Sequence, residues 1–396
     1  FGSRVWSARA RRSDADVAFM APWPCLALLP ILAAADLPRY DLGSNDWRGL
    51  GEQAGGRIRN FFSASTDMAR LDILMRRPEV FAAFERLWAE HRARFPQFAR
   101  EMQAVAVGAG VSQKQLAVYS FKNELIALNA SDASALRGLE DECSDVLVHD
   151  GTAALDGHNE DGEEHLLSTA YWVRTREFEA MAYPGLFPGG AFGFNHDGVT
   201  LAVNALSPKA VALDQGCVGR HWMTRLLLQA RSLEEAIGTL KQHCHTFGMS
   251  LNIGSLQSKA LVNVEIGPGR ATSVKSISAS YFHANAYRHL NVSESPSLSP
   301  SSAHRLARAR ELMPAGSSAD VLRILGDTLD PHWPIYRNSS RGDYGSTVAS
   351  GLFDLRSGTL QVWAGANPKT TAPAFELSLT AFTADGRSGM QRQVVV

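Results

Sequence analysis

The sequence has few cysteines and no excess of charge of either sign. Its 396 residues hold 39 basic and 40 acidic side chains, and its four cysteines include no C-x-x-C pair. This cysteine usage argues against a disulfide framework and a zinc site and favours a reducing, intracellular setting. The charge balance provides no field that would attract nucleic acid or an anionic membrane. We therefore expect neither as a partner.

Long apolar runs are also missing. An apolar stretch near the amino terminus is interrupted by Pro22, Pro24 and Pro30 and is too short to span a bilayer. Because an arginine-rich arm precedes it, residues 1–36 are predicted to be a disordered leader or targeting segment. A cytoplasmic protein is favoured, and a secreted or organellar one stays open if this leader is cleaved.

The periodicity of apolar residues divides the rest of the chain into two parts. Residues 37–142 read as helical, with a buried row predicted at Phe81, Phe84, Trp88 and His91. From Cys143 onward apolar residues recur at every second position, which predicts strands, among them residues 166–175. A hairpin turn is predicted at 195–198, and helices are predicted at 220–230, 232–243 and 303–312. This order of elements indicates a layered α+β sandwich.

Cys143 lies at the boundary between the two parts, where its thiol could attack the carbonyl of Glu142 and cut the chain. The amino group released on Cys143 would titrate near pH ~7.7–8.0 and could take the thiol proton without a histidine partner. Asp161 is a candidate to orient that amine, and Asn204 and Asn285 are candidate oxyanion donors. The plainer alternative is a buried free cysteine at the start of a strand, with asparagines in ordinary turns.

The stretch from Cys143 to Asp161 resembles the penicillin acyltransferase-like family of N-terminal nucleophile cysteine hydrolases. This family includes isopenicillin N acyltransferases and insect β-alanyl-dopamine hydrolases. In it, a nucleophilic cysteine is followed, after a strand and a turn, by Gly-x-Asn-x-Asp, which here reads Gly157-His158-Asn159-Glu160-Asp161. The similarity continues in consistent order from about residue 37 to residue 380.

The resemblance implies a four-layer αββα sandwich, self-cleavage between Glu142 and Cys143, and cleavage of a C–N bond through a thioester. Cys143 would be the nucleophile and, through its amine, the base. Asp161 would bind that amine, while Asn204 and Asn285 would hold the oxyanion. Residues 37–142 would become a small chain and 143–396 a large catalytic chain that stay associated, with a homo-oligomer left open. No cofactor or metal is implied.

Departures from the family pattern bear on the substrate. His158 stands where choloylglycine hydrolases carry an arginine, and Tyr344 stands where relatives place a second one. Losing two guanidiniums removes bidentate carboxylate recognition, which favours an N-acyl amine such as a β-alanyl amine over an N-acyl amino acid. Glu142 replaces the glycine of penicillin acyltransferases and puts cleavage efficiency in question. Trp172 and Phe194 are expected in the core or lining an acyl pocket.

Other functions stay open. Acyl transfer differs from hydrolysis only in what attacks the thioester, and an uncleaved, inactive scaffold would use no chemistry at all. A conventional cysteine–histidine protease needs a histidine that the sequence does not identify. The run His243-Cys244-His245 is not expected to bind metal, because adjacent side chains diverge and no fourth ligand has suitable spacing.

Overall fold

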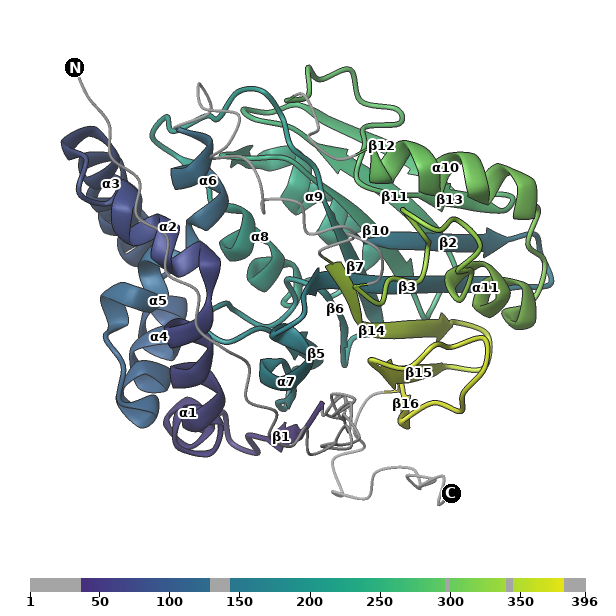
Figure 1. The fold of residues 1–396 in the computed structure, drawn as a ribbon, viewed down its shortest axis with the longest axis horizontal. Coiled ribbons are helices and arrows are strands. Elements are labelled where there is room, and N and C mark those ends of the chain that lie inside the picture. The colour runs from purple at the N-terminus through teal and green to yellow at the C-terminus, as the bar shows by residue number, and fades with distance from the viewer. Residues whose placement is uncertain (1–36, 129–142, 296–299, 340–344, 381–396) are drawn as a thin grey trace, which may run out of the picture. The chain divides into compact units, whose positions relative to one another are not determined.

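The computed structural model describes residues 37–128, 143–295, 300–339 and 345–380, which contain two large β-sheets (Figure 1). The larger has, in spatial order, β1 (Arg39–Asp41), β4 (Tyr171–Arg174), β5 (Phe178–Ala182), β6 (Phe192–Asn195), β7 (Val199–Ala205), β10 (Met249–Ser255), β11 (Leu261–Ile266) and β12 (Thr272–Ser276). The smaller has β13 (Tyr281–His283), β2 (Ser144–His149), β3 (Ala154–Glu163), β14 (Gly345–Asp354), β15 (Thr359–Ala364) and β16 (Phe375–Ser378). Neighbouring strands are antiparallel apart from the parallel pair β1–β4.

The helices fall into three groups along the chain. The first group precedes Cys143 and contains α1 (Trp47–Ala64), α2 (Thr66–Leu74), α3 (Pro78–Arg94), α4 (Pro96–Ala109), α5 (Gln113–Ser120) and α6 (Lys122–Ala127). The others are α7 (Leu166–Thr169), α8 (Arg220–Leu227) and α9 (Leu233–Gln242), and then α10 (Ser301–Leu312) and α11 (Ser318–Leu325). Every described helix is too short or too polar to traverse a bilayer.

The two large sheets pack face to face, with helices on their outer sides. Between them, the ring of Phe192 lies 5.4 Å from the His158 ring and 6.3 Å from that of Phe353. Helix α9 contacts β10 and β12 of the larger sheet, while α11 contacts β2, β3 and β14 of the smaller one (Figure 1). The α+β sandwich with four αββα layers predicted from the sequence is therefore confirmed.

Gly157 lets helix α11 approach strand β3 closely. A Cβ at this position would lie 2.3 Å from Cγ1 of Val321 and 2.9 Å from Cδ1 of Leu325, so any larger residue would force these α11 side chains to shift. Asn159, two residues further along β3, also contacts this region. Its side-chain amide donates hydrogen bonds to the backbone carbonyls of Leu325 and Ile335, at 2.8 and 3.2 Å. Two residues of the Gly-x-Asn-x-Asp motif thus anchor the outer helix, and the others remain for chemistry.

One apolar core joins the helices that precede Cys143 to the strand-rich part that follows it. It includes Phe61, Phe84 and Leu125 from before Cys143 and Leu147 and Trp222 from after it, all almost fully buried. Burial of large apolar side chains stabilises such a joint by roughly 1.5–3 kcal/mol per side chain. The two parts therefore share a core and do not form separate hydrophobic units.

The structure corrects several expectations from the sequence. Residues Arg39–Asp41 form strand β1 within the stretch that was predicted to be helical, and Leu166–Thr169 form helix α7 where a strand was predicted. Phe81 is 40% exposed, because the buried face of α3 is Val80, Ala83, Phe84, Leu87 and His91. The buried face of α3 thus includes Val80 where the prediction had Phe81. Such a one-residue error is easily made when both faces of a helix carry aromatic residues. The hairpin turn at 195–198 is confirmed, with Gly198 at φ +87°.

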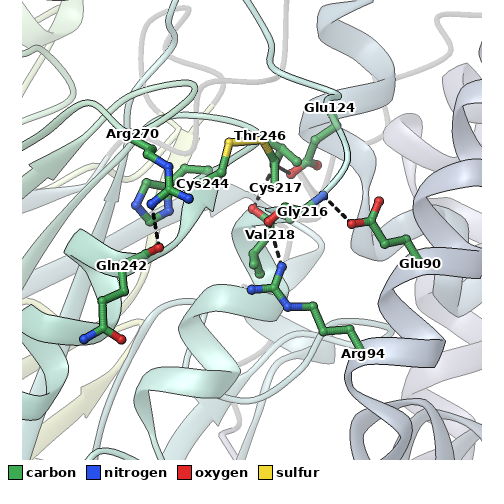
Figure 2. Close-up of a disulfide and its surroundings, with 12 residues drawn as sticks. Glu90, Arg94, Glu124, Gly216, Cys217, Val218, Gln242, Cys244, Thr246 and Arg270 are labelled. Carbon is green, nitrogen blue, oxygen red and sulfur yellow. Dashed lines mark hydrogen bonds between the residues drawn. A yellow bond between two sulfur atoms is a disulfide. The ribbon is translucent and has the colours of Figure 1, made fainter.

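The expectation of no disulfide is wrong for two cysteines. Cys217 and Cys244 are bonded and join β8 (Cys217–Val218) to β9 (Cys244–His245), as Figure 2 shows. Thr246, directly after β9, donates a hydrogen bond of 2.6 Å to Glu124 of α6. The disulfide therefore stabilises the point where the helical front meets the start of α8. The count of widely spaced cysteines could not reveal it, because the fold brings together residues 27 positions apart.

Replacing Cys217 by serine will lower the free energy of unfolding by about 3 kcal/mol, the entropic effect of opening a loop of this length. The loss is measured as a lower midpoint in urea unfolding. Cys244→Ser must give the same loss, since either change removes the bridge. A wild-type midpoint in both variants would show that the bridge contributes no stability.

Candidate active site

Cys143 lies directly before strand β2 and is 1% exposed. Strand β2 pairs with β3 in antiparallel register, with Ser144 opposite Asn159 and Asp145 opposite His158. This pairing brings the motif at 157–161 back beside the cysteine, as the sequence led us to expect. Cys143 is the free cysteine among the described residues.

A hydrogen-bonded network surrounds the thiol. The Sγ atom lies 3.5 Å from Oε2 of Glu160, which also contacts Nε2 of His158 at 2.9 Å. On the other side of the imidazole, Nδ1 lies 2.8 Å from Oδ1 of Asp145. The second oxygen of Glu160 accepts a hydrogen bond of 2.7 Å from the hydroxyl of Tyr183. The imidazole is thus held between two carboxylates, one of which contacts the thiol of Cys143.

Burial and the charges of this network oppose ionisation of the Cys143 thiol. Burial raises the pKa of Cys143, and the nearby charges of Glu160 and Asp161 raise it further, although His158 acts in the opposite direction. Burial alone would lower the pKa of His158, but the Asp145 charge and hydrogen bonds to its neighbours raise it well above its ordinary value. The thiol is therefore held in its neutral form, next to a histidine whose protonated form is favoured.

Asp161 and the two asparagines lie around this network in different ways. Asp161 accepts a hydrogen bond of 2.6 Å from Thr347 and is close enough to Cys143 for its charge to act on the thiol. The amide of Asn285 donates to the carbonyl of Ala205 at 3.0 Å, which places it next to Asn204 at the end of β7. The roles predicted for Asp161, Asn204 and Asn285 stay predictions. The three residues themselves lie near one end of the sandwich.

Asn204 faces the smaller sheet. Its neighbour two residues back, Ala202, lies opposite Phe192, whose ring contacts His158 across the sheets. Because residues two apart on a strand share a face, Asn204 points in the same direction. Its side chain is fully buried, and neither amide atom has a hydrogen-bond partner among the described residues. A buried amide without partners is suited to receive a ligand group.

Arg305 connects Cys143 to Asn285 and was not identified from the sequence. The side chain is fully buried, and Nη1 donates to the carbonyl of Cys143 at 2.5 Å and to the hydroxyl of Ser144 at 2.8 Å. Nη2 donates to Oδ1 of Asn285 at 2.9 Å, and Nε donates to Ser301 at 3.0 Å. No sequence signal distinguished Arg305 from the other arginines of the same predicted helix.

Arg305 places a guanidinium near Cys143, at neither of the two positions where the sequence comparison noted the loss of an arginine. However, all three guanidinium nitrogens of Arg305 donate hydrogen bonds to protein acceptors, and through one of them the side chain holds the backbone of Cys143. His158 lies beside the thiol, as the sequence comparison implied for this position. Its two nitrogens are likewise occupied by carboxylates. Neither cation is presented to a substrate carboxylate.

Other residues singled out from the sequence have different outcomes. Trp172 is fully buried, packs against Phe192 and Phe375, and donates its ring N–H to Glu179 at 3.0 Å. Phe194 is also fully buried, so a role for either in an acyl pocket stays a prediction. Glu142 and Tyr344 lie outside the described residues.

The thiol, Nε2 of His158 and the Glu160 carboxylate lie within 4.8 Å of one another. Such spacing occurs in metal sites, but here the hydrogen bonds of Glu160 to both partners account for the approach of the three atoms. We therefore interpret the trio as a proton-handling network. The sequence identified Cys143 and the motif, but not the partners Asp145 and Tyr183, which carry no motif of their own.

Comparison with known proteins gives consistent results. The family described as acyl-coenzyme A:6-aminopenicillanic acid acyl-transferase matches residues 148–369. The chain is 25% identical over 370 residues to a beta-alanyl-dopamine/carcinine hydrolase of Drosophila melanogaster, covering 86% of this chain and 94% of that protein.

Two solved structures show weaker similarity, each at 11% sequence identity. One is a Caenorhabditis elegans ortholog of N-acylethanolamine-hydrolyzing acid amidase, with a TM-score of 0.38 over 54% of this chain and 93% of that one. The other is penicillin V acylase from Agrobacterium tumefaciens, with a TM-score of 0.32 over 61% and 80%.

Proposed function

Because this chain belongs to the acyl-coenzyme A:6-aminopenicillanic acid acyl-transferase family, we propose that it is a self-processed amidohydrolase with Cys143 as its nucleophile. Its broad class is that of its relatives, amide hydrolases and acyltransferases of the N-terminal nucleophile type. The observation that carries the proposal is the buried thiol of Cys143, hydrogen-bonded to Glu160 and fixed through its own carbonyl by Arg305. A packing cysteine needs neither contact.

Maturation supplies the base for turnover. Cleavage between Glu142 and Cys143 converts the peptide nitrogen of Cys143 into a free amine, which takes the thiol proton. The thiolate then attacks the substrate carbonyl, the C–N bond breaks, and the leaving amine takes that proton. Water attacks the thioester, the amine of Cys143 accepts a proton from water, and the carboxylic acid leaves as the thiol re-forms. Asp161 orients the amine, while Asn204 and Asn285 donate to the oxyanion.

The two chains produced by the cut remain together. Residues 37–142 form the small chain and 143–396 the large one, and the shared core around Phe61 and Leu147 holds them in contact. Residues 1–36 are a leader or targeting segment. The Cys217–Cys244 disulfide favours an oxidising compartment over the cytosol that the cysteine count alone suggested.

The substrate is an N-acyl amine, and a β-alanyl amine fits best. The cations near the thiol, His158 and Arg305, are taken up by protein acceptors, while Asp145 and Glu160 add negative charge. A carboxylate on the leaving group would therefore be buried without a cation. The relative in Drosophila melanogaster bears the name of a hydrolase of such amines.

A matched substrate pair tests this choice. β-Alanyl-histamine and β-alanyl-histidine share their acyl group and ring and differ by one carboxylate. We expect kcat/KM to be at least about 10-fold higher for the histamine amide, equivalent to about 1.4 kcal/mol of transition-state binding. Release of β-alanine is measured for both at one pH. Equal rates, or faster cleavage of the histidine compound, would contradict the assignment.

Acyl transfer is the second candidate, because the matching family carries an acyl-transferase name. Transfer uses the same thioester and differs only when a second amine, instead of water, attacks it. Adding hydroxylamine to the acyl donor separates the two. A transferase forms the hydroxamate at the expense of the free acid even at low hydroxylamine concentration, whereas a hydrolase continues to release mainly acid.

A further inference from the structure

The uncut chain lacks the base that serves the mature enzyme. Until the bond before Cys143 breaks, its nitrogen belongs to a peptide and has no lone pair available to accept a proton. The proposed self-cleavage nevertheless requires the thiol to lose its proton when it attacks. Another group must therefore accept that proton during the single self-cleavage that each molecule undergoes. This inference rests on the self-cleavage proposed above.

Glu160 is in position to be this group. Among the described residues, its Oε2 atom is the acceptor to which the thiol of Cys143 donates, at 3.5 Å. Hydrogen bonds of sulfur are longer than those of oxygen. A separation of 3.5 Å between Sγ and Oε2 is therefore a hydrogen bond along which the thiol proton can pass to the carboxylate. The carboxylate is 2% exposed and cannot turn away freely, because Tyr183 binds one oxygen and His158 the other.

The surrounding charges make an internal transfer less costly than release of the proton to solvent. Before transfer, the trio consists of a neutral thiol, the His158 imidazolium and the Glu160 carboxylate. Afterwards it consists of a thiolate, the same imidazolium and a neutral carboxylic acid. The net charge of the buried trio is unchanged, so no new uncompensated charge is created in the low-dielectric interior. Asp145 keeps the imidazole in place at 2.8 Å throughout.

We propose that Glu160 accepts the thiol proton of Cys143 in the step that cuts the chain, and that the new amine replaces it afterwards. The thiolate forms a C–S bond to the carbonyl carbon of Glu142, and the C–N bond to Cys143 breaks. The carboxylic acid of Glu160 returns its proton to the departing nitrogen, which becomes the amine. Water then hydrolyses the thioester, which frees the carboxyl group of Glu142 and regenerates the thiol.

The test compares cleavage with turnover in Glu160→Gln. The amide has nearly the same shape as the carboxylate but is not a base. The full chain is synthesised in a cell-free system, and samples taken over time are separated on denaturing gels. Because general bases contribute about 10²–10⁴-fold, we expect cleavage to slow at least about 100-fold. Turnover per cut molecule should fall by a much smaller factor than the cleavage rate, since the amine has taken over as the base.

The matched control is Glu163→Gln. Glu163 lies on the same strand and also contacts a histidine, His165 at 3.1 Å, but its partners lie away from the thiol. This variant should be cut at the wild-type rate. If Glu160→Gln does not fold, Glu160→Asp replaces it, because the shorter side chain keeps the charge and withdraws the oxygens by about 1.5 Å. Its cleavage should be at least about 10-fold slower.

The outcomes separate this inference from the proposed function. If wild type and Glu160→Gln are cut at the same rate, Glu160 is not the acceptor, and self-processing stands without it. If turnover per cut molecule falls as far as the cleavage rate, Glu160 serves the mature site and the division of roles is wrong. If wild type is never cut, the self-processing proposal and this inference are both overturned.

Discussion

A chain with Cys143→Ala will remain uncut and will hydrolyse no amide. Alanine removes the nucleophile for both the self-cleavage and the turnover, so no bond to sulfur can form. The loss of kcat/KM should reach about 10⁴-fold or more, as for other nucleophiles that act in a unit with their base. Amine release is measured with β-alanyl-histamine, and the chain length on a denaturing gel.

The control for this experiment keeps Cys143 and replaces both members of the disulfide by serine. That variant loses stability, but at a temperature where it remains folded it should still be cut and active. If the Cys143→Ala chain is processed normally, the nucleophile has been assigned to the wrong residue. Activity that persists in it would have the same consequence.

Arg305→Lys will lower kcat/KM about 100-fold and destabilise the protein. The guanidinium fork binds the Cys143 carbonyl, the Ser144 hydroxyl and the Asn285 side chain at once. Lysine keeps the charge but has no planar fork, so at least one of these buried acceptors loses its donor. Each lost bond to a charged group costs roughly 1.5–3 kcal/mol, and Asn285 is released from its position. Activity assays and urea unfolding measure the two effects.

Arg310→Lys is the matched control, because Arg310 lies on the same helix but is exposed. It should leave both activity and stability unchanged. A wild-type kcat/KM in Arg305→Lys would mean that the position of Cys143 does not depend on this contact. A loss of stability with full activity would assign Arg305 to the fold alone.

The pairing of the nucleophile with its motif could be predicted from the sequence because it is local. The register between β2 and β3 follows from two short strands and one turn, and the glycine and asparagine of the motif have packing roles next to α11. The capping box of α5, between Ser112 and Gln115, is equally local. In each case the interacting residues are near neighbours along the chain.

The contacts that were missed join distant parts of the chain. Arg305 reaches Cys143 across 162 positions, and Tyr183 reaches Glu160 from another strand. Neither residue differs in type from many others, so only the fold identifies it. The same reason explains the missed Cys217–Cys244 bridge and the strand at 39–41, which gains its place by pairing with β4.

The most direct test is amino-terminal sequencing and intact mass measurement of the purified protein. The account predicts two fragments, the larger of which begins Cys143-Ser144-Asp145. It also predicts that they elute together, because the core is shared across the cut. A single uncut chain that nevertheless cleaves β-alanyl-histamine would contradict the central claim that the amine of Cys143 is the base. A single uncut chain without activity would instead indicate an inactive scaffold.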